Sequence, residues 1–294
     1  MKPPVDGSPE WLAERRTGIG ASDIAAVAGL SRYRSPFDVY LDKIGQAAPP
    51  AETAAMHWGH LLEPVVAREW AERHQVRIRR HRAMIRHPQH PWAYAHLDFE
   101  VPGAILEIKT AGHYAADQWG EDGTDMVPPE YMMQVQWQLA CTGRPVGYLA
   151  ALIGAHTYHD YIVPRDQDVI DSLLVIGEAF WERVQSRTPP DVDGSPAAAR
   201  YLAQRFPRAA DDELLVDRGD PIVGTVERLL TLQADIAEKD AEIRALTNAI
   251  KERMGEAGAM RGPRFRVTWR NVKGGTYTVT RPDYRRFTAT AVEE

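Results

Sequence analysis

The chain has 294 residues, of which 44% are hydrophobic and 26% are charged, and its formal net charge is −6. The length fits one large domain, or one domain with an appended unit, and the composition excludes a disordered or fibrous chain. The longest strongly apolar stretch, residues 146–154, is far shorter than the ~20 residues of a membrane span. No secretory signal is visible, and a single cysteine excludes an internal disulfide framework. We therefore expect a cytoplasmic protein without membrane contact.

The first third of the chain predicts helices. A glycine-containing loop leads into a helix over 22–29, with Ser22 as its N-cap. Ser35 before a proline predicts a second helix that ends at Gly45, because this pair is a common helix start. Apolar residues at helical spacing then predict a third helix over 61–74.

The middle of the chain changes to the two-residue period of strands. A Pro102–Gly103 turn joins two of these strands, and a later pair forms a hairpin around Gly154. The predicted elements are strands over 77–85, 93–101 and 104–109, a helix over 130–141, strands over 147–153 and 157–163, and a helix over 166–187. This order predicts an α/β fold with a mixed central sheet flanked by helices.

A different unit follows a loop rich in proline, glycine and acidic residues. An apolar residue recurs every seven positions, which predicts a helical arm with a narrow seam made by Ile222, Leu229, Ile236, Ile243 and Ile250. Alternating strands over 264–272 and 276–280, joined by a glycine turn, predict a C-terminal β-hairpin. We expect a core over 1–195, a linker over 196–221, and the helical arm with its hairpin over 222–294.

Positive charge gathers in two segments. Residues 68–86 hold seven arginines and two acids, and residues 261–290 hold eight basic residues and one acid, with aromatic residues between them. Basic and aromatic side chains together suit phosphates and bases. A solvated basic face with half-buried strand aromatics explains the same pattern, so both interpretations stay open.

The segment LDFEVPGAILEIK carries the chemistry. Asp98 ends one predicted strand, and Glu107 and Lys109 lie two apart on the next, so their side chains share a face. The tight turn between the strands brings Asp98 toward that face. Two carboxylates and an ammonium there can hold a divalent cation and place a water beside it, although a surface salt bridge gives the same spacing.

Four sequence blocks resemble the lambda-exonuclease-type, YqaJ-like phage recombination nucleases, which have the PD-(D/E)xK nuclease fold. They cover roughly residues 8–195 in the family's order: WLAERRTGIGASDIAAVAGLSRYRSPFDVYLDKIG, WGHLLEPVVAREW, LDF…LEIK and YMMQVQWQLA. The resemblance implies a 5′→3′ exonuclease that digests double-stranded DNA ends to 5′-mononucleotides. The remaining 3′ single strand would pass to a single-strand annealing protein. The resemblance also implies a homo-oligomeric ring around DNA, in the host cytoplasm if a phage encodes the chain.

The resemblance assigns a metal site. Asp98, Glu107 and Lys109 match the nuclease triad, and Glu63 matches an acid from the preceding helix that completes the site. The carbonyl of Ile108 is a further implied ligand. The implied cofactor is Mg²⁺, for which Mn²⁺ would substitute.

The resemblance also assigns residues around the substrate. Gln134 matches a glutamine near the attacking water, and Arg15 and Ser22 match the pair that binds the terminal 5′-phosphate. Arg16 is the alternative to Arg15. A serine at a helix N-terminus and a nearby arginine suit an anion on physical grounds as well.

The chain departs from the family at two phosphate contacts. His96 stands where a compared family member has a serine, and Ala115 stands where it has an arginine. The phosphate pocket is therefore weaker or is completed by other basic residues, such as Arg32 or Arg34.

The remaining reactive residues predict no second site. A hard cation prefers carboxylate oxygens to the histidines at 81, 87, 90 and 96, two of which precede turn prolines. Cys141 lies on a helix that is expected to be buried, which favours a packing role.

Two alternatives to the exonuclease remain. One is a structure-selective or restriction-type endonuclease of the same fold. The other is a non-catalytic DNA-binding or assembly protein that uses its basic tail. The intact set of Glu63, Asp98, Glu107 and Lys109 speaks against the second alternative.

Overall fold

The computed structural model describes residues 4, 7–47, 53–210, 213–275 and 286–291. The chain divides into two compact units, residues 1–201 and 202–294, and each is described by itself. None of the helices in these described ranges is long and apolar enough to cross a bilayer.

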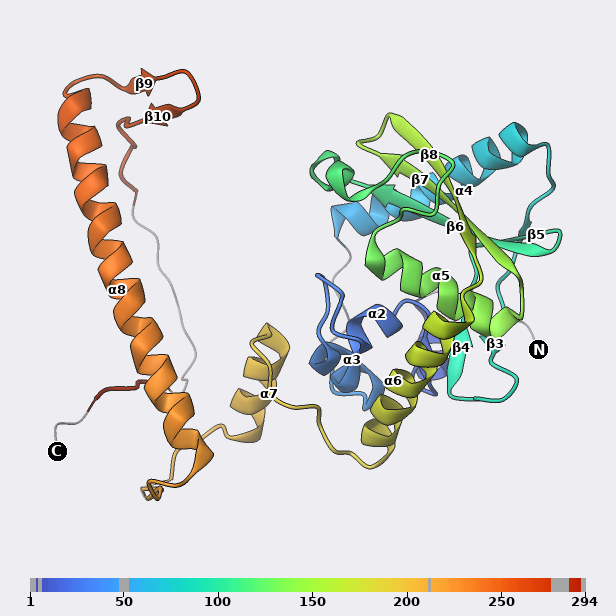
Figure 1. The fold of residues 1–294 in the computed structure, drawn as a ribbon, viewed down its shortest axis with the longest axis horizontal. Helices are drawn as coiled ribbons and strands as arrows, with labels where there is room; N and C mark the ends of the chain where they lie inside the picture. Colours follow the sequence, from blue (N-terminus) through green and yellow to red (C-terminus); the bar gives the residue numbers. More distant parts are fainter. Residues whose placement is uncertain (1–3, 5–6, 48–52, 211–212, 276–285, 292–294) are drawn as a thin grey trace. The chain divides into compact units, whose positions relative to one another are not determined.

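A five-stranded sheet organises the first unit (Figure 1). Its strand order is β2 (Arg79–Arg80), β5 (Phe99–Val101), β6 (Ala104–Ala111), β7 (Val146–Ile153) and β8 (Thr157–Pro164). β6 and β7 run parallel, and the other neighbours are antiparallel. The sheet is therefore mixed, as predicted. A parallel pair needs a crossover, which here contains the 3-10 helix η1 (His113–Gln118) and α5 (Pro129–Thr142).

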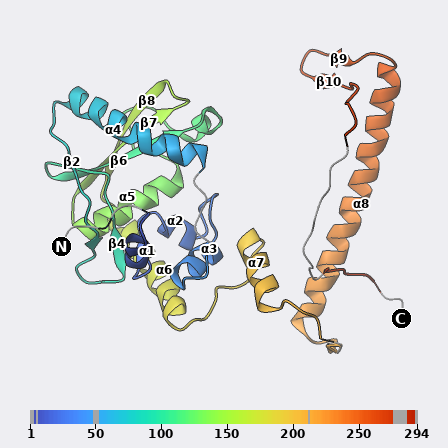
Figure 2. The ribbon, with the colours of Figure 1, turned by 180° about the vertical axis from the view of Figure 1, so that it is seen from behind.

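Helices cover both faces of this sheet (Figures 1 and 2). On one face, α4 (Ala54–His74) packs Trp70 and its neighbours against Leu106 and Ile108. On the other face lies a larger core that includes Ile105 and side chains of α2 (Ile24–Val27), α3 (Pro36–Lys43), α5 and α6 (Gln167–Gln185). Because side chains alternate along β6, Glu107 and Lys109 point with Ile105 toward the α5 side.

A smaller sheet joins β1 (Ile19–Gly20), β4 (Ala93–Ala95) and β3 (Ile85–Arg86). The predicted strand over 93–101 is therefore wrong as one element, because its two ends belong to different sheets. The chain leaves β4 after Ala95 and joins β6 as β5. The predicted strand over 77–85 is likewise reduced to β2, which pairs with β5, and to the start of β3.

The predicted helices are present, with shifted ends. The helix predicted over 61–74 begins earlier, at Ala54, where the Thr53 hydroxyl accepts a hydrogen bond from the Met56 N–H. The helix predicted over 22–29 is only the four-residue α2. A further helix, α7 (Pro196–Arg205), occupies part of the predicted linker, and its first turn buries two alanines in the core. The segment predicted as a linker over 196–221 is therefore helical in its first part.

The second unit contains α8 (Pro221–Met254), which confirms the predicted arm. The isoleucines of the seam are exposed, with the lowest exposure at Ile250 (38%) and the highest at Ile236 (61%). Within the strand predicted over 264–272 lies β10 (Arg266–Thr268), which pairs with β9 (Ala259–Arg261), a strand that was not predicted. The Gly262–Pro263 sequence supplies the turn, with a hydrogen bond from the Gly262 N–H to the Phe265 carbonyl. The other predicted strand, 276–280, lies outside the described residues.

Candidate active site

Strand β6 places Glu107 and Lys109 on one face, as the spacing predicts. The Lys109 ammonium donates to Glu107 Oε1 over 2.6 Å. The Glu107 side chain is 4% exposed and that of Lys109 is 19% exposed. The pair therefore lies at the margin of the core, where electrostatic interactions are strong and the solvent is still within reach.

Asp98 lies in the connection between β4 and β5, beside this pair. Its Oδ2 accepts a hydrogen bond from the Ile108 N–H over 2.8 Å. Burial, followed by repulsion from Glu107, raises the pKa of Asp98 well above its usual value; Glu63 adds to the repulsion, and Lys109 opposes it. Several carboxylates thus crowd one site, and a bound cation would relieve their repulsion.

Two amides on one face of α5 hold the Glu107 carboxylate. Gln134 donates to Oε1 and Gln138 donates to Oε2, each over 2.6 Å. The fully buried Gln138 amide also donates to the His96 carbonyl over 3.2 Å. Gln138 was not among the site residues predicted from the sequence. Its signal is the four-residue spacing from Gln134, which places both side chains on one helix face.

Lys109 is held as a cation. Its ammonium lies 5.1 Å from the centroid of the Tyr131 ring, and that ring stacks on Trp119. Burial alone would lower the pKa of Lys109, but Glu107 and Asp98 raise it above its usual value. At neutral pH the side chain is therefore protonated, which favours an electrostatic or water-orienting role over proton abstraction.

Glu63 has a cation of its own. It forms an ion pair with Arg80 over 2.7 Å, while Lys109 and the two glutamines take up the Glu107 oxygens. Among the residues that the structure describes, no group of three or more His, Cys, Asp or Glu side chains is placed to hold a metal ion. Carboxylate and carbonyl oxygens are nevertheless the donors that Mg²⁺ prefers. The residues fit Mg²⁺ by donor chemistry and by the crowding of carboxylates at Asp98.

The histidines and the cysteine have local contacts. His87 Nδ1 accepts hydrogen bonds from the N–H groups of Gln89 and His90, which closes a turn, and the His81 ring is 3.2 Å from Glu100 Oε1. Cys141 is buried, and burial raises the pKa of its thiol to about 12. The thiol is therefore protonated and suited to packing.

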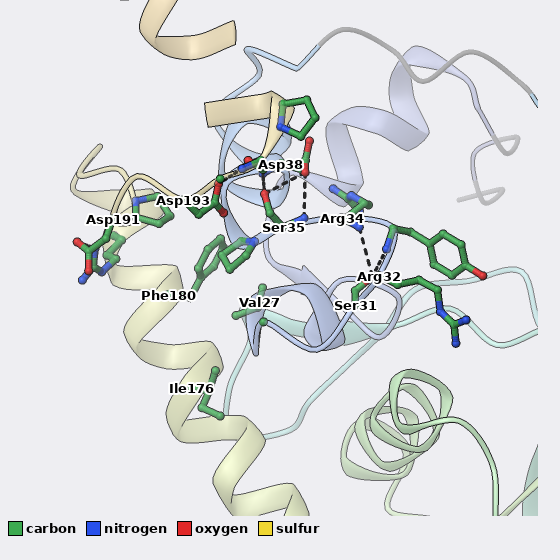
Figure 3. Close-up of a pocket in the computed structure, with 18 of the residues that line it drawn as sticks. Val27, Ser31, Arg32, Arg34, Ser35, Asp38, Ile176, Phe180, Asp191 and Asp193 are labelled. Atoms are coloured by element: carbon green, nitrogen blue, oxygen red, sulfur yellow. Dashed lines mark hydrogen bonds and ion pairs between the residues drawn. The ribbon is translucent and has the colours of Figure 1, made fainter. Parts of the chain in front are cut away.

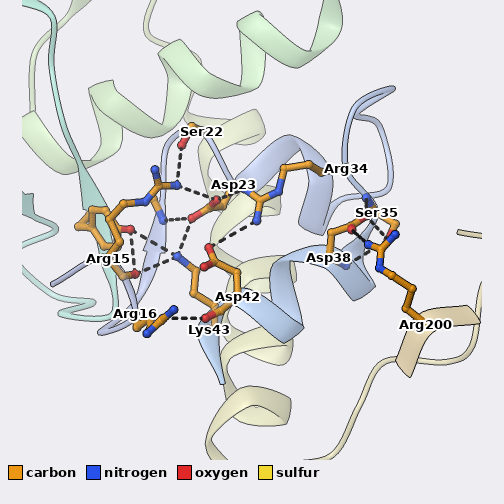
Figure 4. Close-up of polar contacts among 12 residues, drawn as sticks. Arg15, Arg16, Ser22, Asp23, Arg34, Ser35, Asp38, Asp42, Lys43 and Arg200 are labelled. Carbon is orange, nitrogen blue, oxygen red and sulfur yellow. Dashed lines mark hydrogen bonds and ion pairs between the residues drawn. The ribbon is translucent and has the colours of Figure 1, made fainter. Parts of the chain in front are cut away.

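A second cluster surrounds the buried Asp23 (Figure 4). Arg15 Nη2 lies 3.4 Å from Asp23 Oδ1 and 3.5 Å from the Ser22 hydroxyl. The fully buried Lys43 donates to Asp23 Oδ2 over 2.7 Å. Burial alone would raise the pKa of Asp23, but Lys43, Arg15 and Arg34 together hold it well below its usual range. The structure thus brings Arg15 and Ser22 together, as the resemblance implies.

The helix-terminus argument for Ser22 is wrong. Asp23, not Ser22, is the N-cap of α2. A helix this short has little dipole, and the carboxylate at its start repels an anion. The groups of this cluster that are placed to contact an anion are the arginines and the exposed Ser22 hydroxyl. Arg16 donates to the Asp42 carbonyl over 3.1 Å instead, so Arg15 and not Arg16 is the arginine beside Ser22.

The two clusters are neighbours through one aromatic contact. The Arg15 guanidinium lies 4.6 Å from the centroid of the Trp11 ring, whose other contact is the His96 ring at 6.2 Å. His96 is two residues before Asp98. Ala115, the other departure from the family, lies on η1 and offers no donor.

Part of the basic segment over 68–86 is neutralised within the protein. Three of its arginines pair with acids: Arg73 with Glu69, Arg79 with Glu100, and Arg80 with Glu63. These pairs reduce the charge that this segment can offer to DNA.

A groove of about 870 Å³ lies beside the Asp23 cluster (Figure 3). The loop before α3 forms one wall with Arg32 and Arg34, α6 forms another with Phe180, and residues 190–196 close it. The groove mixes apolar side chains with charges of both signs.

Comparison with known proteins identifies the fold and then the family. The fold is shared with a crystal structure of an alkaline exonuclease (LHK-Exo) from Laribacter hongkongensis, with a TM-score of 0.50 and 21% identity over 67% of this chain and 97% of that chain. A second structure, LHK-Exo in complex with dAMP, matches equally well at 22% identity.

The model of the YqaJ-like viral recombinase domain matches residues 10–145. The protein called "Uncharacterized protein YqaJ" from Bacillus subtilis is 33% identical over 254 residues, which cover 84% of this chain and 78% of that protein. The chain belongs to the YqaJ-like viral recombinase family.

Proposed function

We propose that this chain is a metal-dependent deoxyribonuclease that digests double-stranded DNA from its 5′ ends. It releases 5′-mononucleotides and leaves 3′ single strands for recombination by annealing. The observation that carries this proposal is the Glu107–Lys109 pair on β6, the central strand of the mixed sheet, with Asp98 beside it. The fold of LHK-Exo, an alkaline exonuclease that has been crystallised with dAMP, supports the same chemistry.

Each residue has a distinct task in this proposal. Asp98, Glu107, Glu63 and the Ile108 carbonyl would hold one or two Mg²⁺ ions, which, when bound, lower the pKa of a water and stabilise the leaving oxygen. Gln134 and Gln138 fix the orientation of the Glu107 carboxylate. The protonated Lys109 orients the attacking water and offsets the negative charge on the reacting phosphate.

The partners belong to the same proposal. A duplex end supplies the substrate, and Arg15 with Ser22 binds its 5′-phosphate. A single-strand annealing protein would receive the 3′ strand, and a homo-oligomeric ring would keep the enzyme on DNA.

The test uses three substrates with Mg²⁺ or Mn²⁺: a 5′-phosphorylated linear duplex, the same duplex with blocked 5′ ends, and a covalently closed plasmid. We expect digestion of the first alone, with 5′-mononucleotides as product and none in EDTA. Cleavage of the plasmid would indicate an endonuclease. Binding of the duplex without cleavage of any substrate would indicate a non-catalytic DNA-binding protein.

A further inference from the structure

Two arginines from separate segments meet at the buried Asp23. Arg34 Nη1 lies 2.8 Å from Asp23 Oδ1, the same oxygen that Arg15 Nη2 approaches to 3.4 Å. Asp23 itself is fully buried, whereas the Arg15 and Arg34 side chains are 21% and 32% exposed. An incoming anion therefore meets the two guanidinium groups and not the carboxylate between them (Figure 4).

Arg32, the other basic candidate, is engaged elsewhere. Its guanidinium forms an ion pair with Glu130 over 2.8 Å and contacts Gln118. These partners lie on α5 and η1. Arg34 is thus the residue of this loop that shares a partner with Arg15.

Local hydrogen bonds fix the backbone position of Arg34. The Ser31 hydroxyl accepts hydrogen bonds from the N–H groups of Tyr33 and Arg34. On the other side, Ser35 and Asp38 form a reciprocal cap at the start of α3. Figure 3 shows both contacts on the loop. Since the loop is tied at both sides of Arg34, little ordering is needed when an anion binds.

The charges of the cluster favour an anion. Arg15, Arg34 and Lys43 face Asp23 and Asp42, so these five side chains leave one positive charge in excess. Lys43 is buried and fixes Asp23 in place, so the excess charge is presented by the two exposed arginines. Their remaining N–H groups, with the Ser22 hydroxyl, suit the oxygens of a terminal phosphate.

We propose that Arg34 and Arg15 together form the 5′-phosphate clamp of this protein, with Asp23 as the buried anchor that sets their spacing. Arg34 supplies a guanidinium group, which neither His96 nor Ala115 carries. The inference rests on the proposed function, because it names a selectivity residue for a 5′-phosphorylated duplex end.

The test is a binding measurement in EDTA, which needs no cleavage. The probes are two hairpin duplexes that differ only in a 5′-phosphate or a 5′-hydroxyl. We expect wild type to prefer the phosphate. Arg34→Ala should weaken binding of the phosphorylated probe about tenfold and of the hydroxyl probe about twofold or less. Arg34→Lys should recover part of the preference, because lysine restores the charge without the two-pronged geometry.

Arg68→Ala is the matched control, because Arg68 is an exposed arginine of α4 outside the cluster. It should affect both probes equally. Circular dichroism checks that each variant is folded. If Arg34→Ala does not fold, the comparison of the two probes is made with Arg34→Lys. Equal losses of Arg34→Ala on the two probes, or no preference in wild type, would overturn the inference.

A digestion assay with Mg²⁺ separates this inference from the proposed function. If wild type binds the phosphorylated probe preferentially but digests neither probe, and Arg34→Ala lacks the preference, the clamp stands and the nuclease proposal fails. If wild type digests DNA and Arg34→Ala keeps its full preference for the phosphate, the nuclease stands and the clamp fails.

Discussion

Lys43→Met tests whether the Asp23 cluster is anchored as described. The substitution keeps most of the side chain but leaves Asp23 without its nearest cation. Removing one partner of a buried ion pair costs about 3–5 kcal/mol. Asp23 retains Arg34 at 2.8 Å and the Gly20 N–H at 3.2 Å, so we expect the lower end, about 3 kcal/mol. For a unit of this size that lowers Tm by about 6–12 °C.

Thermal unfolding followed by circular dichroism measures the effect. The double variant Asp23→Asn, Lys43→Met removes the stranded charge and should recover most of the loss. Arg73→Met, which breaks an exposed pair with Glu69, should change stability by less than about 1 kcal/mol. A Tm within about 2 °C of wild type, or a double variant as unstable as Lys43→Met, would refute the anchoring role.

The pH dependence of this loss has a definite sign. The pKa of Asp23 is held below its usual range in the folded protein. A depressed carboxyl pKa contributes stability that is present above the unfolded value, about 3.9, and that is lost as the pH falls through the folded value. The difference between wild type and Lys43→Met should therefore persist from pH 8 to 5 and narrow below about pH 4.

Four further predictions concern the carboxylates, the lysine, the end-binding arginine and the arm. Asp98→Asn should abolish digestion yet raise the Tm measured in EDTA. The pKa of Asp98 is raised in the folded protein, so wild type loses stability as the pH rises above about 4. The higher stability of the variant should therefore vanish below that pH. Lys109→Ala should slow digestion roughly 10²–10³-fold, the loss typical of a positioned electrostatic donor, with little change in metal affinity. Calorimetry that shows metal binding lost with the lysine would contradict this role. Arg15→Ala should impair digestion of a 5′-phosphorylated duplex much more than of a 5′-hydroxyl duplex, whereas equal rate losses would assign Arg15 to general backbone binding. Truncation before Asp220 should leave the first unit folded, and an unfolded product would contradict an independent unit. A weaker salt dependence of DNA binding would assign the removed tail to phosphate contacts. Loss of an oligomer in light scattering would assign the tail to assembly.

The sequence was sufficient for the parts of the site that depend on local periodicity. Glu107 and Lys109 share a face because strand side chains alternate, and the Pro102–Gly103 turn fixes β5 against β6. Gly103 has a φ of +79° in that turn, a conformation that glycine adopts without strain. The α5 crossover and the β7–β8 hairpin follow from equally local signals.

Long-range pairing limited the rest. The alternation over 93–101 is continuous in sequence, yet β4 and β5 pair in different sheets, and no local signal distinguishes them. Ser22 and Asp23 are both good N-caps. Their assignment depends on Lys43, a residue on another helix, which draws Asp23 into the interior. Strand β9, which pairs with β10, was likewise not predicted, because it has only three residues.

Strand β4 and helix α5 hold the Asp23 cluster and the carboxylates of the candidate active site in a fixed relation. The Trp137 indole N–H donates to the Tyr94 carbonyl over 3.0 Å, and the next residue, Gln138, donates to the His96 carbonyl. The Tyr94 hydroxyl in turn donates to the carbonyl of Arg15 over 2.9 Å, while the Gln138 amide also bonds Glu107. Helix α5 thus ties the segment that carries Arg15 and the strand that carries Glu107 to β4 and the residue that follows it. The proposed exonuclease would cleave at a set distance from a bound terminal phosphate. That task needs rigid spacing, because a small misplacement of the reacting phosphate lowers the rate steeply.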